Sequence, residues 1–216
     1  TSSGVTPSPT PTLTSTPGNS PTPSQTRTVT ATPSPTATFS GIDVTVTLQQ
    51  GSDGYSGCQD THIYRWSENS NYCTRTEVEV GYKRQYATLI RFSLSSIPSN
   101  AVVTRAVLQL YATGWSGSSM TFEAYRVLRE ISACQTTWNQ SQTGNAWGTP
   151  GCENTSTDRG ALAESSVTAT SIYRWYALDL TGLVQDWVSG TQDNNGLLLR
   201  GADALSTLKF YFSSAQ

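Results

Sequence analysis

The sequence predicts an all-β fold, a jelly-roll β-sandwich with one short helix, preceded by an extended arm rich in Ser, Thr and Pro. Three observations predict it. From Ile42 onward, apolar residues alternate with polar ones at a period of two, and Gly, Ser and Asn separate the runs. One segment alone has helical spacing. The first 40 residues hold 29 Ser, Thr or Pro, a composition that buries too little apolar surface to fold alone.

The expected strands are the alternating runs of the second part. In residues 44–48, for example, three apolar side chains share one face and two threonines share the other, as in a half-buried strand. About nine such runs fit a sandwich, most simply a jelly roll. They are residues 44–48, 61–66, 76–80, 87–94, 106–112, 121–128, 173–180, 196–201 and 207–213.

The expected helix covers residues 181–190. Thr181 stands at the N-cap position and Gly190 where a C-terminal cap belongs, and apolar residues at 183, 184, 187 and 188 form a helical stripe. We expect this short helix to lie across one end of the sandwich.

Length and charge limit the number of domains and the partners. The sequence predicts an arm at 1–40 and one jelly-roll domain at 41–216, since roughly 175 residues are enough for a single core. Charged residues make up 13%, the net charge is −2, and Arg27 is the only ionised side chain of the arm. Nucleic acid and anionic membranes are not expected partners, because both bind clustered Lys and Arg.

Several features predict an extracellular protein, secreted or on the cell surface. The chain begins at Thr1 without an initiator Met, so we expect a secretion signal to have been removed. The sequence contains no run of 18 apolar residues, so no membrane span is expected.

The four cysteines fall as two close pairs, Cys58 with Cys73 and Cys134 with Cys152. Pairing these neighbours closes loops of about 15 to 20 residues, each contributing on the order of 3 kcal/mol of stability. A zinc site is less well supported, because the chain has one histidine and no C-x-x-C motif. We expect disulfides, as in other exported proteins.

An ordered set of motifs resembles the family called the DNRLRE domain: "RFSLSSIPSNAVVTRAVLQLYA", "YRVLREI", "TTWN", "WYALDLTGLVQDWVSG", "DNNGLLLRG" and "FYFSS". The similarity covers about residues 44–214. The helix followed by "NNGLLL" is its most specific part. The resemblance implies a jelly roll, an extracellular location, and a binding or structural role rather than catalysis.

The resemblance also implies a missing strand. Members of that family usually follow the last motif with a further apolar strand, whereas this sequence ends at Gln216. We therefore expect an open sheet edge and an apolar groove, which proteins seldom leave uncovered. The arm offers a replacement strand within residues 26–32, where hydroxyl and apolar side chains alternate between flanking prolines. The expected donor strand comprises Arg27, Thr28, Val29, Thr30 and Ala31.

Insertion of this strand has two forms. Ten residues or so separate it from the domain, a reach of roughly 30 Å, which allows insertion into the same chain or into a neighbour. Insertion into a neighbour is a head-to-tail contact that does not close, so it produces a filament in which the chain is its own partner. We favour the filament. The alternative is a monomeric carbohydrate-binding module on a glycosylated stalk.

The arm is also the expected place for O-linked glycans, since hydroxyls beside Pro in an extended backbone are accessible. No other bound group is expected with comparable support. The candidate residues are Thr6, Ser8, Thr10, Thr12, Thr14, Thr16, Thr22, Ser24, Thr32, Ser34, Thr36 and Thr38.

Tryptophans carry the carbohydrate-binding alternative, because aromatic rings stack on the apolar faces of sugars. Trp115 and Trp147 are interpreted as loop residues, where recognition sites gather, and are the candidate platforms. Trp175 and Trp187 follow strand and helix patterns and are expected in the core. For Trp138 the family resemblance implies a structural anchor.

Catalysis is not expected. His62 is the only histidine and lies in an alternating strand, which favours a structural role. A pair of carboxylates able to hydrolyse glycosides remains open, because Glu77, Glu79, Glu123 and Asp179 are placed to meet across strands. Alternation more simply turns most of them toward solvent.

A structural calcium ion is a weaker expectation. Asp53, Asp60 and Asp158 are acidic residues in or near the expected loops, but their spacing matches no defined calcium loop.

Overall fold

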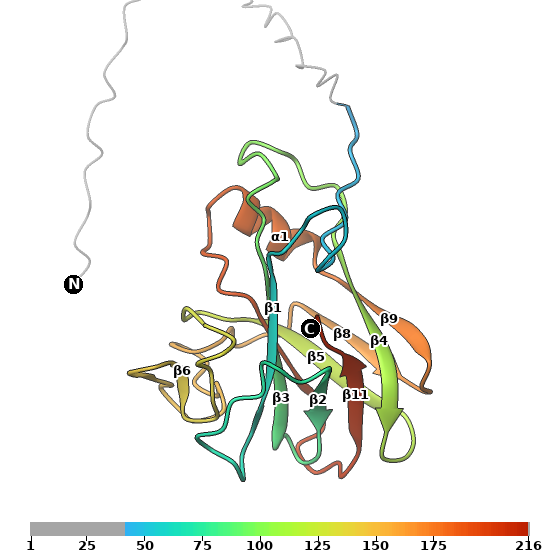
Figure 1. Cartoon of the computed structure of the whole chain (residues 1–216), viewed down its shortest axis with the longest axis vertical. Helices are drawn as coiled ribbons and strands as arrows, with labels where there is room; N and C mark the ends of the chain where they lie inside the picture. The colour runs from blue at the N-terminus through green and yellow to red at the C-terminus, as the bar shows by residue number, and fades with distance from the viewer. Residues whose placement is uncertain (1–41, 216) are drawn as a thin grey trace, which may run out of the picture. The chain divides into compact units, whose positions relative to one another are not determined.

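The computed structural model describes residues 42–215. Contacts set Thr45–Gln216 apart as one unit, and of the residues before it only 42–44 are described. The expected boundary between residues 40 and 41 lies outside the described part. The Thr45–Gln216 unit is mostly β, with eleven strands and one short helix (Figure 1). The predicted jelly-roll class is confirmed.

Nine strands form one continuous sheet in the order β8-β5-β10-β3-β2-β11-β4-β9, and β1 pairs with β3. They are β1 (Cys58–Tyr64), β2 (Glu77–Gly81), β3 (Tyr86–Phe92), β4 (Val107–Trp115), β5 (Met120–Arg126), β8 (Ser165–Ala169), β9 (Arg174–Asp179), β10 (Leu197–Gly201) and β11 (Lys209–Ser213). A separate ribbon consists of β6 (Gln140–Gln142) and β7 (Asn145–Ala146).

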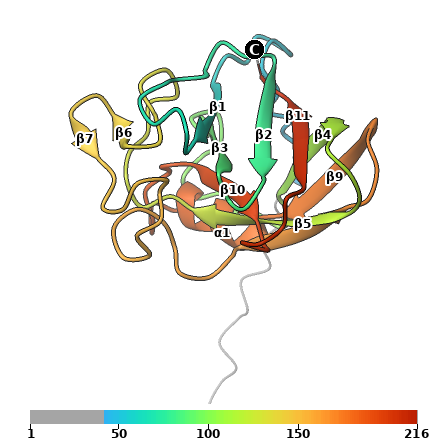
Figure 2. The same cartoon turned by 90° about the horizontal axis from the view of Figure 1, so that it is seen from below.

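The sheet folds over at the hairpin between β2 and β3, where the ladder consists of the pair Gly81 and Tyr86. One layer therefore contains β8, β5, β10, β3 and β1, and the other contains β2, β11, β4 and β9. Figure 2 shows strands of both layers, among them β3 and β10 of the first and β11 and β4 of the second. The main core fills the space between them. Phe122 on β5 contacts Phe212 on β11 across the layers, with ring centroids 5.1 Å apart, and both are fully buried.

A second core covers the outer face of the first layer. Ile63, Leu89 and Leu198 point to this face, where they pack under Trp138 and Trp147 from the long connection after β5. Both faces of this layer are therefore apolar. This explains why β10 is buried along its whole length.

The helix α1 spans Thr181–Val188 and lies at one end of the sandwich (Figure 1). Leu183 and Val188 are buried, as the stripe predicted. Gly190 has a φ of +72°, which confirms it as the residue that ends the helix. The N-cap is Leu180 rather than Thr181. Thr181 instead donates its backbone N–H and its hydroxyl to Asp179 Oδ1, at 2.9 and 2.7 Å.

One strand prediction is wrong, and β6, β7 and β8 are not among the expected strands. Residues 44–48 form no strand, and Val44 and Val46 are 75% and 47% exposed. Conversely, β8 was not expected, because its sequence, Ser-Ser-Val-Thr-Ala, has little apolar content.

The expected gap beside the last strand is also wrong. The last strand, β11, lies inside its layer and pairs with β2 on one side and β4 on the other. Among the described residues, the strands that pair with one neighbour only are instead β1, β8 and β9.

Candidate functional site

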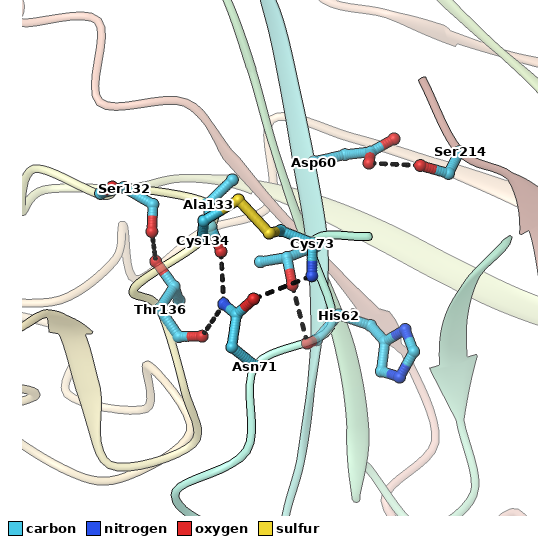
Figure 3. The surroundings of a disulfide bond; sticks show 10 residues. Asp60, His62, Asn71, Cys73, Ser132, Ala133, Cys134, Thr136 and Ser214 are labelled. Carbon is cyan, nitrogen blue, oxygen red and sulfur yellow. Dashed lines mark hydrogen bonds between the residues drawn. A yellow bond between two sulfur atoms is a disulfide. The ribbon is translucent and has the colours of Figure 1, made fainter. Parts of the chain in front are cut away.

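The edge strand β1 is buried on both faces although only β3 pairs with it among the described strands. Asp60 and His62 project from one face, away from the Cys73–Cys134 disulfide (Figure 3). The ring of Tyr72 stacks on His62 with centroids 4.2 Å apart. The connection that follows β1 therefore returns beside this edge and protects it without adding a strand.

Two hydrogen bonds hold the last described residues, Ser214 and Ala215, to Asp60 on β1. Ser214 donates its hydroxyl to Asp60 Oδ1 at 2.6 Å, and the N–H of Ala215 donates to Asp60 Oδ2 at 2.7 Å (Figure 3). Burial raises the pKa of the Asp60 carboxyl above its usual range, although both hydrogen bonds act in the opposite direction. Asp60 thus holds the last described residues to β1.

His62 is a structural residue. Burial lowers its pKa to about 4, against the attraction of Glu79, whose Oε1 lies 3.9 Å from Nε2. His62 is therefore neutral at pH 7. Glu79 is itself bound to Lys209, at 2.6 Å, and the Lys209 ammonium lies over the ring of Tyr86.

Three of the four carboxylates considered as a catalytic pair make local contacts. Glu79 binds Lys209, Glu123 accepts a hydrogen bond from Tyr125 at 2.6 Å, and Asp179 accepts from the start of α1. Glu77 is exposed at the beginning of β2. The structure does not bring them together as an acid and base around one substrate.

The predicted disulfide pairing is wrong. The bond joins Cys73 to Cys134, 61 residues apart, with Cα atoms 5.0 Å apart (Figure 3). Asn71 reinforces this junction by donating its side-chain amide to the carbonyls of Ala133 and Thr136, at 2.5 and 2.7 Å. Folding therefore brings the connection after β1 against the connection after β5, and neighbours in sequence are not neighbours in space.

The other two cysteines are free thiols in the described structure. Cys58 belongs to the main core and Cys152 to the second core. Burial raises the pKa of the Cys58 thiol to about 12 and raises that of Cys152 well above its usual range. Neither thiol is reactive at neutral pH, because the thiolate is the reactive form.

Of the two predicted sugar platforms, Trp147 is buried and Trp115 is half-buried. Trp147 is 5% exposed and donates its indole N–H to the carbonyl of Thr137 at 3.0 Å. Trp115 ends β4 rather than lying in a loop, and its ring packs edge-on against Phe210. Trp138 is buried in the second core, in agreement with its expected anchoring role.

An aromatic pair lies on the outer face of β4 and β9. Trp175 was expected in the core but is 60% exposed, on the outer face of β9. It lies directly across from Tyr111 of β4, with ring centroids 5.2 Å apart and planes tilted by 58°. The exposed Gln109 follows on the same face. Tyr211 adds a third ring, which lies over Gly114.

An open hollow of about 460 Å³ lies between β8, β9 and α1. Its walls include Arg126, Glu164, Ser165, Asp179 and Asp186. Arg126 binds Glu164 at 2.5 Å and Asp186 at 3.3 Å. The walls therefore carry three carboxylates and one guanidinium, which gives the hollow a negative balance.

The expected calcium ligands do not meet. Asp158 is fully buried and accepts backbone N–H groups from Gly148, Thr149 and Asn154. Asp53 and Asp60 join no cluster of three His, Cys, Asp or Glu residues within the described part. The donor strand (Arg27, Thr28, Val29, Thr30 and Ala31) and the twelve O-glycan candidates lie outside the described residues.

Within residues 42–215, no helix is long and apolar enough to cross a membrane. A comparison with curated proteins found no match. A comparison with protein families found the disaggregatase related repeat domain over residues 60–216. This is a β-rich repeat family, and it carries a different name from the DNRLRE domain that the motifs resemble. Because the match covers well over half of the sequence, the chain belongs to the disaggregatase related repeat family.

Proposed function

We propose that this protein is a non-catalytic structural subunit of an extracellular, glycosylated filament. The arm of one subunit donates a strand to the sandwich of the next. This contact is head-to-tail and leaves a free donor and a free acceptor at the two ends, so it propagates. The Ser/Thr/Pro composition favours an extended arm that carries O-linked glycans.

The observation that carries the proposal is the set of sheet edges without a paired strand in the described sandwich, at β1, β8 and β9. An edge presents backbone N–H and C=O groups that another strand can satisfy. The arm contains a segment of strand length with alternating side chains, residues 26–32. A sheet edge that can accept a strand and a segment that can donate one are therefore present in the same chain.

Removal of residues 1–40 is expected to abolish fibres while the sandwich stays folded, because the donor strand is lost and the core is not. Negative-stain electron microscopy measures the fibres, and circular dichroism checks the fold. Val29→Asp in the full chain is expected to have the same effect, since it places a carboxylate on the apolar face of the donor. Leu13→Asp, the same kind of change elsewhere in the arm, is the matched control. Fibres from the truncated chain would contradict the proposal, as would dispersed full-length monomers.

A second candidate function, a monomeric carbohydrate-binding module, is favoured by Trp175 and Tyr111. A large exposed apolar ring on a sheet face is unusual and often marks a binding surface. The tilted pair offers two ring faces, and Gln109 supplies amide donors and acceptors beside them. The outward side chains at these three positions are uncharged, which suits a neutral polysaccharide.

Trp175→Ala is expected to weaken binding of a soluble neutral polysaccharide by about tenfold, which corresponds to about 1.4 kcal/mol. Affinity electrophoresis against galactomannan, xylan and dextran measures it. Trp66→Ala is the matched control, because Trp66 is 68% exposed but lies on the connection after β1, where its indole N–H donates to Gln85. Equal loss in both variants, or no binding by the unmodified protein, would reject this candidate.

A further inference from the structure

The arm contains a copy of part of an edge strand of the sandwich. The sequence Val-Thr-Ala-Thr occurs twice in the chain, at residues 29–32 and 167–170. The second copy forms most of β8, which pairs with β5 alone among the described strands. Val167 lies opposite Phe122 and packs against the main core, and Ala169 lies opposite Met120 and is fully buried.

We propose that the donor strand of one subunit occupies the β8 position of the next, with Val29 in place of Val167 and Ala31 in place of Ala169. This inference rests on the proposed function and names the receiving site. Thr30 then takes the place of Thr168, whose hydroxyl lies 2.7 Å from the hydroxyl of Thr121 on β5. The four-residue identity means that the receiving strand meets the same side chains as in the unassembled subunit.

Charge supports this register. It places Arg27 where Ser165 stands, on the wall of the acidic hollow. Asp179 and Asp186 line the same hollow from β9 and α1, which are not part of β8. Arg27 is the only ionised residue among the first 40, and it arrives beside carboxylates that outnumber the local cation.

The end of the donor strand fits as well. Thr32 takes the place of Thr170, whose N–H donates to the hydroxyl of Tyr176 at 2.9 Å. The next residue of the arm, Pro33, takes the place of Ser171. It cannot donate the N–H that Ser171 gives to the same hydroxyl. Pairing is therefore expected to stop at Thr32, at the position where β8 itself has just ended.

β8 is suited to exchange. Ser166 and Thr168 are exposed, and Val167 and Ala169 are its only side chains in contact with the main core. Exposed residues flank it, with Leu162 83% and Tyr173 70% exposed. Edge segments with few buried contacts open at low free-energy cost. The inserted strand restores to β5 the contacts that the displaced β8 gave up, because the two sequences are identical over these residues.

Cysteine cross-linking between separate chains tests the receiving site. Full-length chains carrying Thr30→Cys are mixed with full-length chains carrying Thr121→Cys under a mild oxidant, and disulfide-linked dimers are counted on a non-reducing gel. The control acceptor is Gln59→Cys, an exposed position on the other edge strand of the same layer, β1. Wild-type chains should form no dimers, because Cys58 and Cys152 are buried and Cys73 is bonded to Cys134.

The expected result is a dimer band at least tenfold stronger with Thr121→Cys than with Gln59→Cys, in samples that contain fibres. Fibres that link to Gln59→Cys, or that do not link to Thr121→Cys, overturn the β8 site and leave the filament intact. A further variant carries Thr30→Cys and Thr121→Cys in one chain. If no fibres form and the two cysteines link only within this chain, the β8 site and the filament are both overturned. Arg27→Asp is expected to slow assembly at least tenfold and Arg27→Lys to preserve it; equal rates would remove the electrostatic part of the argument.

Discussion

Phe122→Ala is expected to lower the free energy of unfolding by about 3–5 kcal/mol, the range for truncating a buried aromatic side chain. Phe122 is fully buried on β5 and contacts Phe212 of β11. It therefore joins the two layers at their centre. Its neighbours belong to strands on both sides of the core, so they cannot collapse into the space without moving a sheet, which places the loss in the upper part of the range.

Urea unfolding followed by tryptophan fluorescence measures the change, with the disulfide intact in both proteins. Leu205→Ala is the control, because Leu205 is 82% exposed and such surface changes alter stability by about 0.5 kcal/mol or less. The urea midpoint should fall with an unchanged slope. A loss below about 1 kcal/mol would mean that the two layers do not depend on this contact.

Most of the fold follows from alternation in the sequence. Eight of the nine expected strands are present, since a period of two turns the apolar side chains of each strand toward a common face. The wrong prediction at residues 44–48 and the missed strand β8 have one cause. Alternation shows that a segment is compatible with a sheet, but not that a partner strand is available. Residues 44–48 alternate well and remain unpaired, whereas β8 alternates weakly and is held by its ladder with β5.

The candidate sites were harder to predict. In β9 both faces carry aromatic residues, and the sequence does not say which face is buried. Tyr176 and Leu178 point inward, so Trp175 must point outward. Trp147 lies in a loop, where exposure is expected, but this loop packs against the outer face of the sheet and buries the ring. The sequence repeats Val-Thr-Ala-Thr in the arm and in β8. This repeat indicates a receiving strand only once the structure shows that β8 is an edge strand.

Loss of the disulfide is the second large effect expected. The double variant Cys73→Ala/Cys134→Ala is expected to be about 4 kcal/mol less stable, from the loop-closure entropy of the 61 residues between the two positions. This loop contains β2, β3, β4 and β5, so the unfolded state gains freedom over a large part of the sandwich. Without the covalent bond, the hydrogen bonds of Asn71 to Ala133 and Thr136 would still hold the connection after β1 to the connection after β5.

Three comparisons isolate the bond. Urea midpoints of the double variant should equal those of wild type treated with a reductant, since both lack the same bond. Asn71→Ala keeps the disulfide and is expected to cost about 1–3 kcal/mol, because two carbonyls lose their donor. Alkylation of unfolded, unreduced wild type should label two cysteines, Cys58 and Cys152. Labelling of none would instead indicate a second bond between these two residues. Folding in the present arrangement forbids that bond, since one thiol lies between the layers and the other lies outside them.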